Sequence, residues 1–104
     1  MSELQGLSGA PAGTLITISE LHRLATFLGC GYDVDAHHEA NGHWVVIFTI
    51  ADRRYGLSTV RGQLRRWRRL EPLLTFLSAH CQYHDAMRLH TGSWTFSRSA
   101  APDN

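Results

Sequence analysis

This chain of 104 residues contains no lysine, and all ten of its basic residues are arginine. It also lacks a long hydrophobic run. The longest, Trp44 to Ile50, is far shorter than the roughly 20 residues that cross a membrane as a helix. The N-terminal residues have neither the basic nor the apolar segment of a signal peptide. We therefore expect no membrane span and a cytoplasmic protein.

Cysteine is scarce as well, because Cys30 and Cys81 are the only two. One pair in a chain without an export signal is weak grounds for a disulfide, so we expect both thiols to be reduced. Of the seven histidines, His80 and His84 flank Cys81, but neither cysteine has a second cysteine nearby. We therefore expect no metal and no cofactor, and we attribute the histidines to exposed or hydrogen-bonded positions.

Catalytic motifs are missing too. The sequence has no nucleophile elbow, no phosphate-binding loop, no His-Glu-x-x-His motif and no convincing acid/base pair. These absences favour a protein that is not an enzyme.

The length and the 43% apolar content suit one folded domain with a modest core. Residues 1–14 are rich in Gly, Ala, Ser and Pro and predict a flexible leader. A single domain then covers 15–96, and 97–104 form a flexible tail. We expect an α+β fold in which two helices pack on an antiparallel sheet of three to four strands.

The first helix is predicted over residues 18–29. Thr17 and Glu20 have the spacing of a capping box, and Gly29 suits the left-handed C-terminus of a helix. Apolar residues recur at helical spacing and predict a buried stripe of Ile18, Leu21, Leu24, Ala25 and Leu28.

Two strands follow, over residues 32–37 and 43–51, around the turn dipeptide Asn41-Gly42. The second is apolar on both faces, which is typical of a central strand. A two-residue turn would place Asp33 and Asp35 on the core face at a high cost. We therefore expect a bulge or a longer loop at 39–42 that returns Tyr32 and Val34 to the core.

Two more hairpins are predicted downstream. A two-residue loop at Asp52-Arg53 leads into a strand over residues 54–59. A three-residue loop over 60–62, with Gly62 left-handed, then pairs Leu57 with Arg65 and Tyr55 with Trp67.

A second helix is predicted over residues 70–81, with a buried stripe of Leu70, Leu73, Leu74 and Leu77. Both helices should cover the sheet face of Trp44, Val46 and Phe48. Residues 83–90 then predict a last strand and Thr91-Gly92 a turn. Trp94 and Phe96 are expected to be an apolar anchor.

The chain is nearly neutral, with a formal charge of +1, yet seven of its arginines gather in one stretch. They are Arg53, Arg54, Arg61, Arg65, Arg66, Arg68 and Arg69. Arginine binds phosphate or carboxylate with a planar, bidentate fork and stacks on aromatic rings. The alternative to a binding site is a solvated face with local ion pairs. If Tyr55 and Trp67 lie in the core, only the arginines can bind.

Residues 54–78 carry a resemblance. This stretch contains the pattern Leu57-x-Thr59-x-Arg61-Gly62, followed by Arg65-x-Trp67 and by a helix that begins with Leu70-Glu71 and ends in Phe76-Leu77. With this pattern it resembles small accessory proteins of plasmids and integrative elements. Some of these are partition-associated. The resemblance implies a bacterial mobile genetic element as the context.

Two functions remain open. In the first, the protein is a non-catalytic accessory protein that binds nucleic acid through the arginine-rich hairpin. In the second, it is a protein-binding module or inhibitor, for example of a host defence complex, in which the same arginines meet an acidic protein surface. A second copy of the chain is a further partner, through one apolar face of the 44–50 strand.

Overall fold

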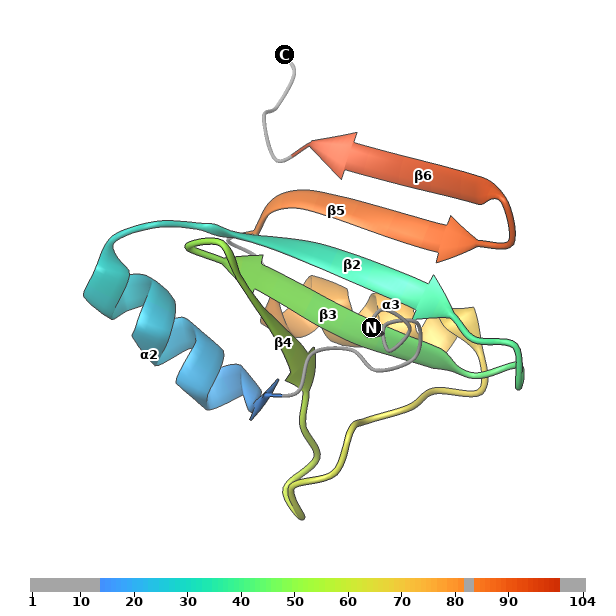
Figure 1. Ribbon diagram of the computed structural model, residues 1–104, viewed down its shortest axis with the longest axis horizontal. Coiled ribbons are helices and arrows are strands. Elements are labelled where there is room, and N and C mark those ends of the chain that lie inside the picture. Colours follow the sequence, from blue (N-terminus) through green and yellow to red (C-terminus); the bar gives the residue numbers. More distant parts are fainter. Residues whose placement is uncertain (1–13, 82–83, 100–104) are drawn as a thin grey trace, which may run out of the picture.

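The computed structural model describes residues 14–81 and 84–99, which form a six-stranded sheet and two helices (Figure 1). Along the chain the elements are β1 (Leu15–Ile16), α2 (Ile18–Leu28), β2 (Tyr32–His38), β3 (Trp44–Ile50), β4 (Arg53–Leu57), α3 (Leu70–His80), β5 (His84–Thr91) and β6 (Trp94–Ser99). The order in the sheet is β1-β4-β3-β2-β5-β6. Neither described helix is long and apolar enough to cross a membrane.

The α+β class is confirmed, but the prediction of three to four antiparallel strands was wrong. The sheet is mixed, because β1 runs parallel to β4 and β5 runs parallel to β2. With two residues, β1 is too short to show a period in the sequence. The connection through α3 returns the chain to the edge of β2, which gives β5 its parallel direction.

The first helix forms as predicted. The Thr17 side chain accepts a hydrogen bond from the Glu20 amide, and the Glu20 carboxylate accepts one from the Thr17 amide. Hydrogen bonding of the Glu20 carboxyl group to Thr17, first of all to the Thr17 amide, lowers the pKa of Glu20. Gly29 ends the helix in the left-handed conformation. Leu28 was wrongly placed in the buried stripe, since it lies in the last turn and is 44% exposed.

The loop between β2 and β3 has the predicted extra length. Glu39 and His43 face each other across a three-residue loop, and Gly42 has a φ of 90°. His38 therefore pairs with Trp44 and Val34 with Phe48. This register puts Tyr32 and Val34 in the core and turns the aspartates of β2 to the opposite face.

The turn between β3 and β4 is one residue earlier than predicted. Its two loop residues are Ala51 and Asp52, both with positive φ, so that Ile50 pairs with Arg53. Tyr55 consequently lies opposite Phe48, whereas the predicted loop at Asp52-Arg53 would have placed it opposite Ile50. The shift of register is two residues, which leaves Tyr55 on the predicted face.

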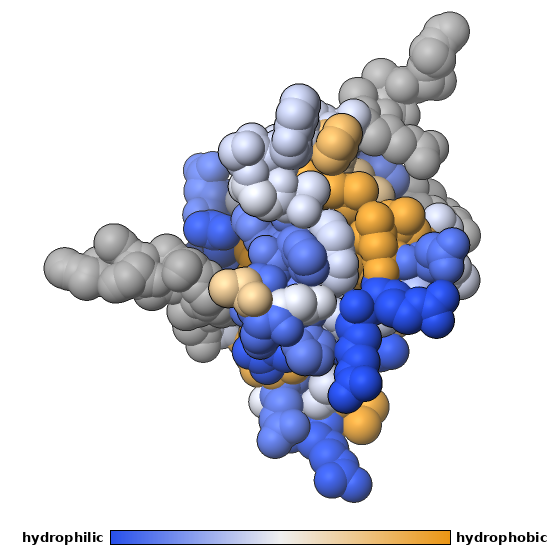
Figure 2. Space-filling model, turned by 90° about the vertical axis from the view of Figure 1, so that its right-hand side faces the viewer, coloured by the Kyte–Doolittle hydropathy of each residue, from blue (hydrophilic) through white to orange (hydrophobic). Residues whose placement is uncertain are grey.

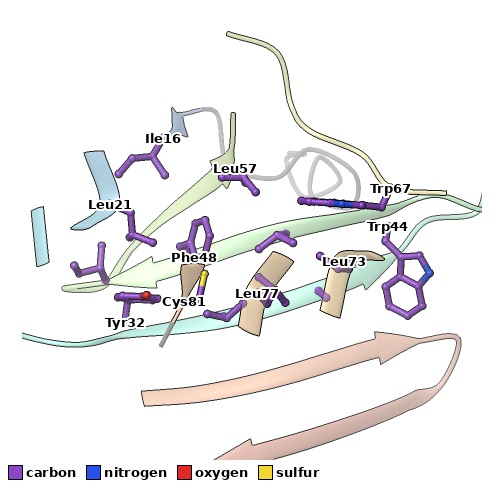
Figure 3. Close-up of a cluster of buried hydrophobic side chains, with 14 residues drawn as sticks. Ile16, Leu21, Tyr32, Trp44, Phe48, Leu57, Trp67, Leu73, Leu77 and Cys81 are labelled. Carbon is purple, nitrogen blue, oxygen red and sulfur yellow. The ribbon is translucent and has the colours of Figure 1, made fainter. Parts of the chain in front are cut away.

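One apolar cluster joins the sheet to both helices, as predicted (Figure 3). Leu21 of α2 and Leu73 and Leu77 of α3 pack with Val46 and Phe48 of β3, and all five are fully buried. Leu70 is partly buried at the margin of the cluster. β3 is also buried on its other face, which confirms it as a central strand.

The C-terminal part differs from expectation. Trp94 and Phe96 do not anchor the chain, because they lie on β6, the outermost strand, and are 68% and 55% exposed. Residues 97–99, expected in the tail, continue β6. The predicted strand at 83–90 is β5, and Tyr83 lies outside the described residues, as do 1–13 of the leader and 100–104 of the tail.

Candidate nucleic-acid interface

The third hairpin has the predicted three-residue loop at 60–62, with Gly62 at a φ of 82°. Ser58 pairs with Leu64, and the Arg65 amide donates to the Leu57 carbonyl at 2.8 Å. The register predicted for this hairpin is therefore confirmed at its tip.

Beyond Arg65 the pairing changes. Trp67 does not face Tyr55 but exchanges two backbone hydrogen bonds with Trp44, at 2.7 and 2.9 Å. The last residue of β4 that pairs with β3 is Gly56, so the segment after the hairpin crosses to the free start of β3. This crossing carries the arginines from the hairpin tip to the N-terminus of α3 (Figure 1).

Arg65 is held inside this arrangement. Its guanidinium carbon lies 4.7 Å from the centre of the Trp67 ring and 4.9 Å from that of Phe76. Both distances are within the range of a cation–π contact. The side chain is only partly exposed, so Arg65 fixes the segment against α3 more than it offers charge to a partner.

Arg61, Arg66, Arg68 and Arg69 are exposed. Arg66 donates to Glu39 and Arg69 to Glu71, each at 3.2 Å. In residues 14–81 and 84–99, neither Arg61 nor Arg68 forms an ion pair. We call residues 61–69 the arginine segment. Its five arginines outnumber the two carboxylates that are bound to them. Hydrophilic side chains cover most of the lower half of the molecular face in Figure 2.

Arg53 and Arg54 lie elsewhere. Arg53 pairs with Ile50 at one end of β3, whereas Trp67 pairs with Trp44 at the other end. Six residues of strand separate these points, which is about 20 Å. The seven arginines of the predicted site therefore form two groups.

The aromatic residues between the arginines belong to the core. Trp67 is 8% exposed and lies among buried side chains beside Trp44 and Leu73 (Figure 3). Tyr55 packs at the margin of the same cluster. Trp67 is buried and Tyr55 is only partly exposed, so these two rings are not the groups through which the hairpin would bind nucleic acid.

A polar network on the sheet face opposite the core was not predicted. Arg88 of β5 donates to both oxygens of Asp35, at 2.7 and 3.1 Å, and to Asp33 at 3.1 Å. His90 Nε2 lies 2.7 Å from Asp35, and the His90 ring stacks on His37 at 4.4 Å. The parallel pairing of β2 with β5, which the sequence did not reveal, brings these residues together.

Hydrogen bonding and burial set the charges in this network. Burial acts to raise the pKa of Asp35, but the bonds from Arg88 and His90 outweigh it and lower the pKa. The two aspartates raise the pKa of Arg88 through the same bonds. Burial lowers the pKa of His37. The network is thus a set of satisfied charges that holds β5 against β2.

The remaining histidines and the cysteines form no such group. Among the described residues, no three His, Cys, Asp or Glu side chains are placed to hold a metal ion. Cys30 is exposed and Cys81 is buried, and both are free thiols. Burial raises the pKa of Cys81 to about 11, so this thiol is protonated at neutral pH.

Comparison of the chain with protein-family models, curated proteins and solved structures finds no match.

Proposed function

We propose that this protein is a non-catalytic accessory protein of a bacterial mobile genetic element, and that it binds nucleic acid through its arginine segment. The observation that supports this proposal is the arrangement of Arg61, Arg66, Arg68 and Arg69. They are exposed along one continuous segment that is bonded to β3 and packed on α3. The resemblance of residues 54–78 to plasmid accessory proteins supports the context.

The bound state follows from the chemistry of the side chains. Arg68 has no ion pair in the described part of the chain and is ready for a phosphate. Arg69 exchanges the exposed carboxylate of Glu71 for a phosphate, which costs little because exposed ion pairs contribute at most about 1 kcal/mol. Arg66 gives up Glu39, whose side chain is 15% exposed, so this exchange costs more than that of Arg69. Each phosphate contact releases condensed counterions, so binding weakens as salt rises.

A matched pair of double variants tests the proposal. Arg66→Ala with Arg68→Ala removes two charges from the arginine segment, whereas Arg53→Ala with Arg54→Ala removes two exposed charges elsewhere. In about 50 mM salt we expect the first variant to bind a 20-base-pair duplex about tenfold more weakly, and the second to bind within about twofold of the parent. Equal losses in the two variants would contradict an interface at this segment.

A second function is favoured by one observation. Glu39 and Glu71 already bind Arg66 and Arg69 at 3.2 Å, so these arginines can bind carboxylates as well as phosphates. An acidic protein surface is therefore the alternative partner. Fluorescence anisotropy with labelled polyglutamate beside the labelled duplex separates the two. Binding of polyglutamate alone would favour the protein-binding module.

A further inference from the structure

The hairpin tip at residues 59–63 is built as a fixed unit. The Thr59 amide donates to the Gln63 carbonyl at 2.7 Å, and the Gly62 amide donates to the Thr59 carbonyl at 3.0 Å. The Thr59 hydroxyl oxygen accepts from the amides of Arg61 and Gln63, each at 3.2 Å. Four hydrogen bonds across five residues hold this loop in one conformation before any partner arrives.

The side chains that this unit carries contribute little to the fold. Val60 is 100% exposed, and Arg61 and Gln63 are also exposed. In the portion of the chain that the structure describes, the side chains of Arg61 and Gln63 take part in no hydrogen bond. The tip projects away from the sheet and the helices in Figure 1. A rigid loop therefore presents one apolar, one cationic and one amide side chain to the solvent.

We propose that this tip enters the major groove of duplex DNA and reads bases with Val60, Arg61 and Gln63. The inference rests on the proposed function and deepens it. In the major groove, arginine pairs with the O6 and N7 atoms of guanine, glutamine pairs with the N6 and N7 atoms of adenine, and apolar side chains contact the methyl group of thymine. The three exposed side chains of the tip are of these three kinds.

The dimensions favour the major groove. It is about 12 Å wide and admits a two-stranded ribbon, whereas the minor groove is only about 6 Å wide. The two sides of the hairpin are joined by the Ser58–Leu64 pair, so they lie about 5 Å apart. From Arg65 to Gln63 the hairpin rises two residues, or about 7 Å at the rise of a strand. The loop at 60–62 extends beyond Gln63, so the tip can reach the floor of a groove about 8.5 Å deep.

The base of the hairpin completes the geometry. When the tip is in the groove, Arg66 is the exposed arginine nearest to the phosphates that border it, and Arg68 and Arg69 follow along the same segment. Phosphate contacts fix the position of a protein on the duplex, and base contacts give it sequence preference. The arginine segment thus divides into a positioning part and a reading part.

Selection from a pool of random 20-base-pair duplexes tests this division. We expect the parent protein to enrich a short common sequence and to bind it about tenfold more tightly than a scrambled duplex. The double variant Val60→Ala with Arg61→Ala should bind the enriched and the scrambled duplex with nearly equal affinity. Its melting temperature should equal that of the parent protein. Arg68→Ala should weaken binding to both duplexes alike and keep the preference for the enriched one.

A change in the DNA tests the Arg61 contact directly. Placing 7-deazaguanine at the enriched guanine removes the N7 acceptor, which lies in the major groove. The substitution should weaken binding of the parent severalfold and leave binding of Arg61→Ala unchanged. A selected sequence without a guanine, or an equal loss in both proteins, would overturn the assignment.

Two other results are distinguishable. In one, the selection enriches no sequence, and in the other, the variant Val60→Ala with Arg61→Ala keeps the preference for the enriched over the scrambled duplex. If duplex binding still depends on Arg66 and Arg68 in either case, the reading tip is wrong and the proposed function stands. If the parent protein binds no duplex of the pool, the reading tip is wrong, and if it binds no single strand either, the proposed function fails as well.

Discussion

The guanidinium carbon of Arg65 lies 4.7 Å from the centre of the Trp67 ring, and the Trp67 ring in turn packs against Phe76 of α3 at 5.2 Å. This contact makes one arginine of a basic segment a packing residue. Because Trp67 is bonded to β3 through Trp44, the same contact ties the segment to both the sheet and the helix. The exposed arginines on either side are thereby held in place.

Arg65→Ala should therefore destabilise the fold by about 1 kcal/mol, because it removes the cation–π contacts and the packing of the side-chain stem. Arg68→Ala is the matched control, since Arg68 is exposed, and its effect should lie within about 0.5 kcal/mol of zero. Urea unfolding of the two variants measures the difference. Equal stability of the two would show that the stacking of Arg65 contributes nothing.

The polar network predicts unequal roles for the two aspartates of β2. Asp35→Asn should cost about 2 kcal/mol, because the Asp35 side chain is 12% exposed and receives bonds from Arg88 and His90. Asp33→Asn should cost less than about 1 kcal/mol, because this side chain is 35% exposed and, within residues 14–81 and 84–99, accepts a hydrogen bond from Arg88 only. Thermal or urea unfolding checks both values, and a larger loss for Asp33→Asn contradicts this account.

Because the pKa of His37 is lowered in the folded protein, we expect the stability of the protein to depend on pH. This pKa is lowered by burial and then by His90, against the opposing effect of Asp35; Arg54 and Glu39 act more weakly and in opposite directions. The unfolded chain therefore binds a proton at a higher pH than the folded one. The contribution of neutral His37 to the free energy of unfolding is fully present above the ordinary histidine pKa of about 6.5. It is lost as the pH falls toward the lower pKa that His37 has in the folded protein.

The variant His37→Phe keeps an aromatic ring beside His90 and removes the titration. Between pH 7.5 and pH 5.5 the parent should lose more free energy of unfolding than this variant does. Urea unfolding at the two pH values gives the comparison. The same loss in both proteins would mean that His37 does not contribute to acid sensitivity.

The turn at Ala51 and Asp52 places two residues with side chains at positive φ, of 51° and 65°. Such positions cost an ordinary residue about 1 kcal/mol, and glycine avoids this cost. Because Ala51 is exposed, Ala51→Gly should stabilise the protein by roughly 0.5–1 kcal/mol. Gly42→Ala, at a φ of 90°, should destabilise it. A lower melting temperature for Ala51→Gly would contradict the expected gain.

The sequence predicted the features that depend on local chemistry. The capping box at Thr17, the left-handed Gly29 and Gly62, and the longer loop before β3 all follow from residue types and from the cost of burying Asp33 and Asp35. It did not predict the parallel pairs, because nothing local to β1 or β5 specifies which strand they meet.

The same distinction applies to the candidate site. The exposed arginines and the three-residue loop were predictable from composition and turn residues. The separation of Arg53 and Arg54 from the arginine segment was not, because it depends on Trp67 pairing with Trp44. The bond between Asp35 and Arg88 was equally hidden, since the two residues lie 53 positions apart in the sequence.

The salt dependence of duplex binding tests the central claim most directly. If Arg66, Arg68 and Arg69 neutralise phosphates, the logarithm of the association constant should fall against the logarithm of salt concentration with a slope of about −3. Arg66→Ala with Arg68→Ala should flatten that slope by about two units, and Arg53→Ala with Arg54→Ala should leave it unchanged. No detectable binding of duplex or single strand at low salt, or an unchanged slope in the first variant, would contradict the claim.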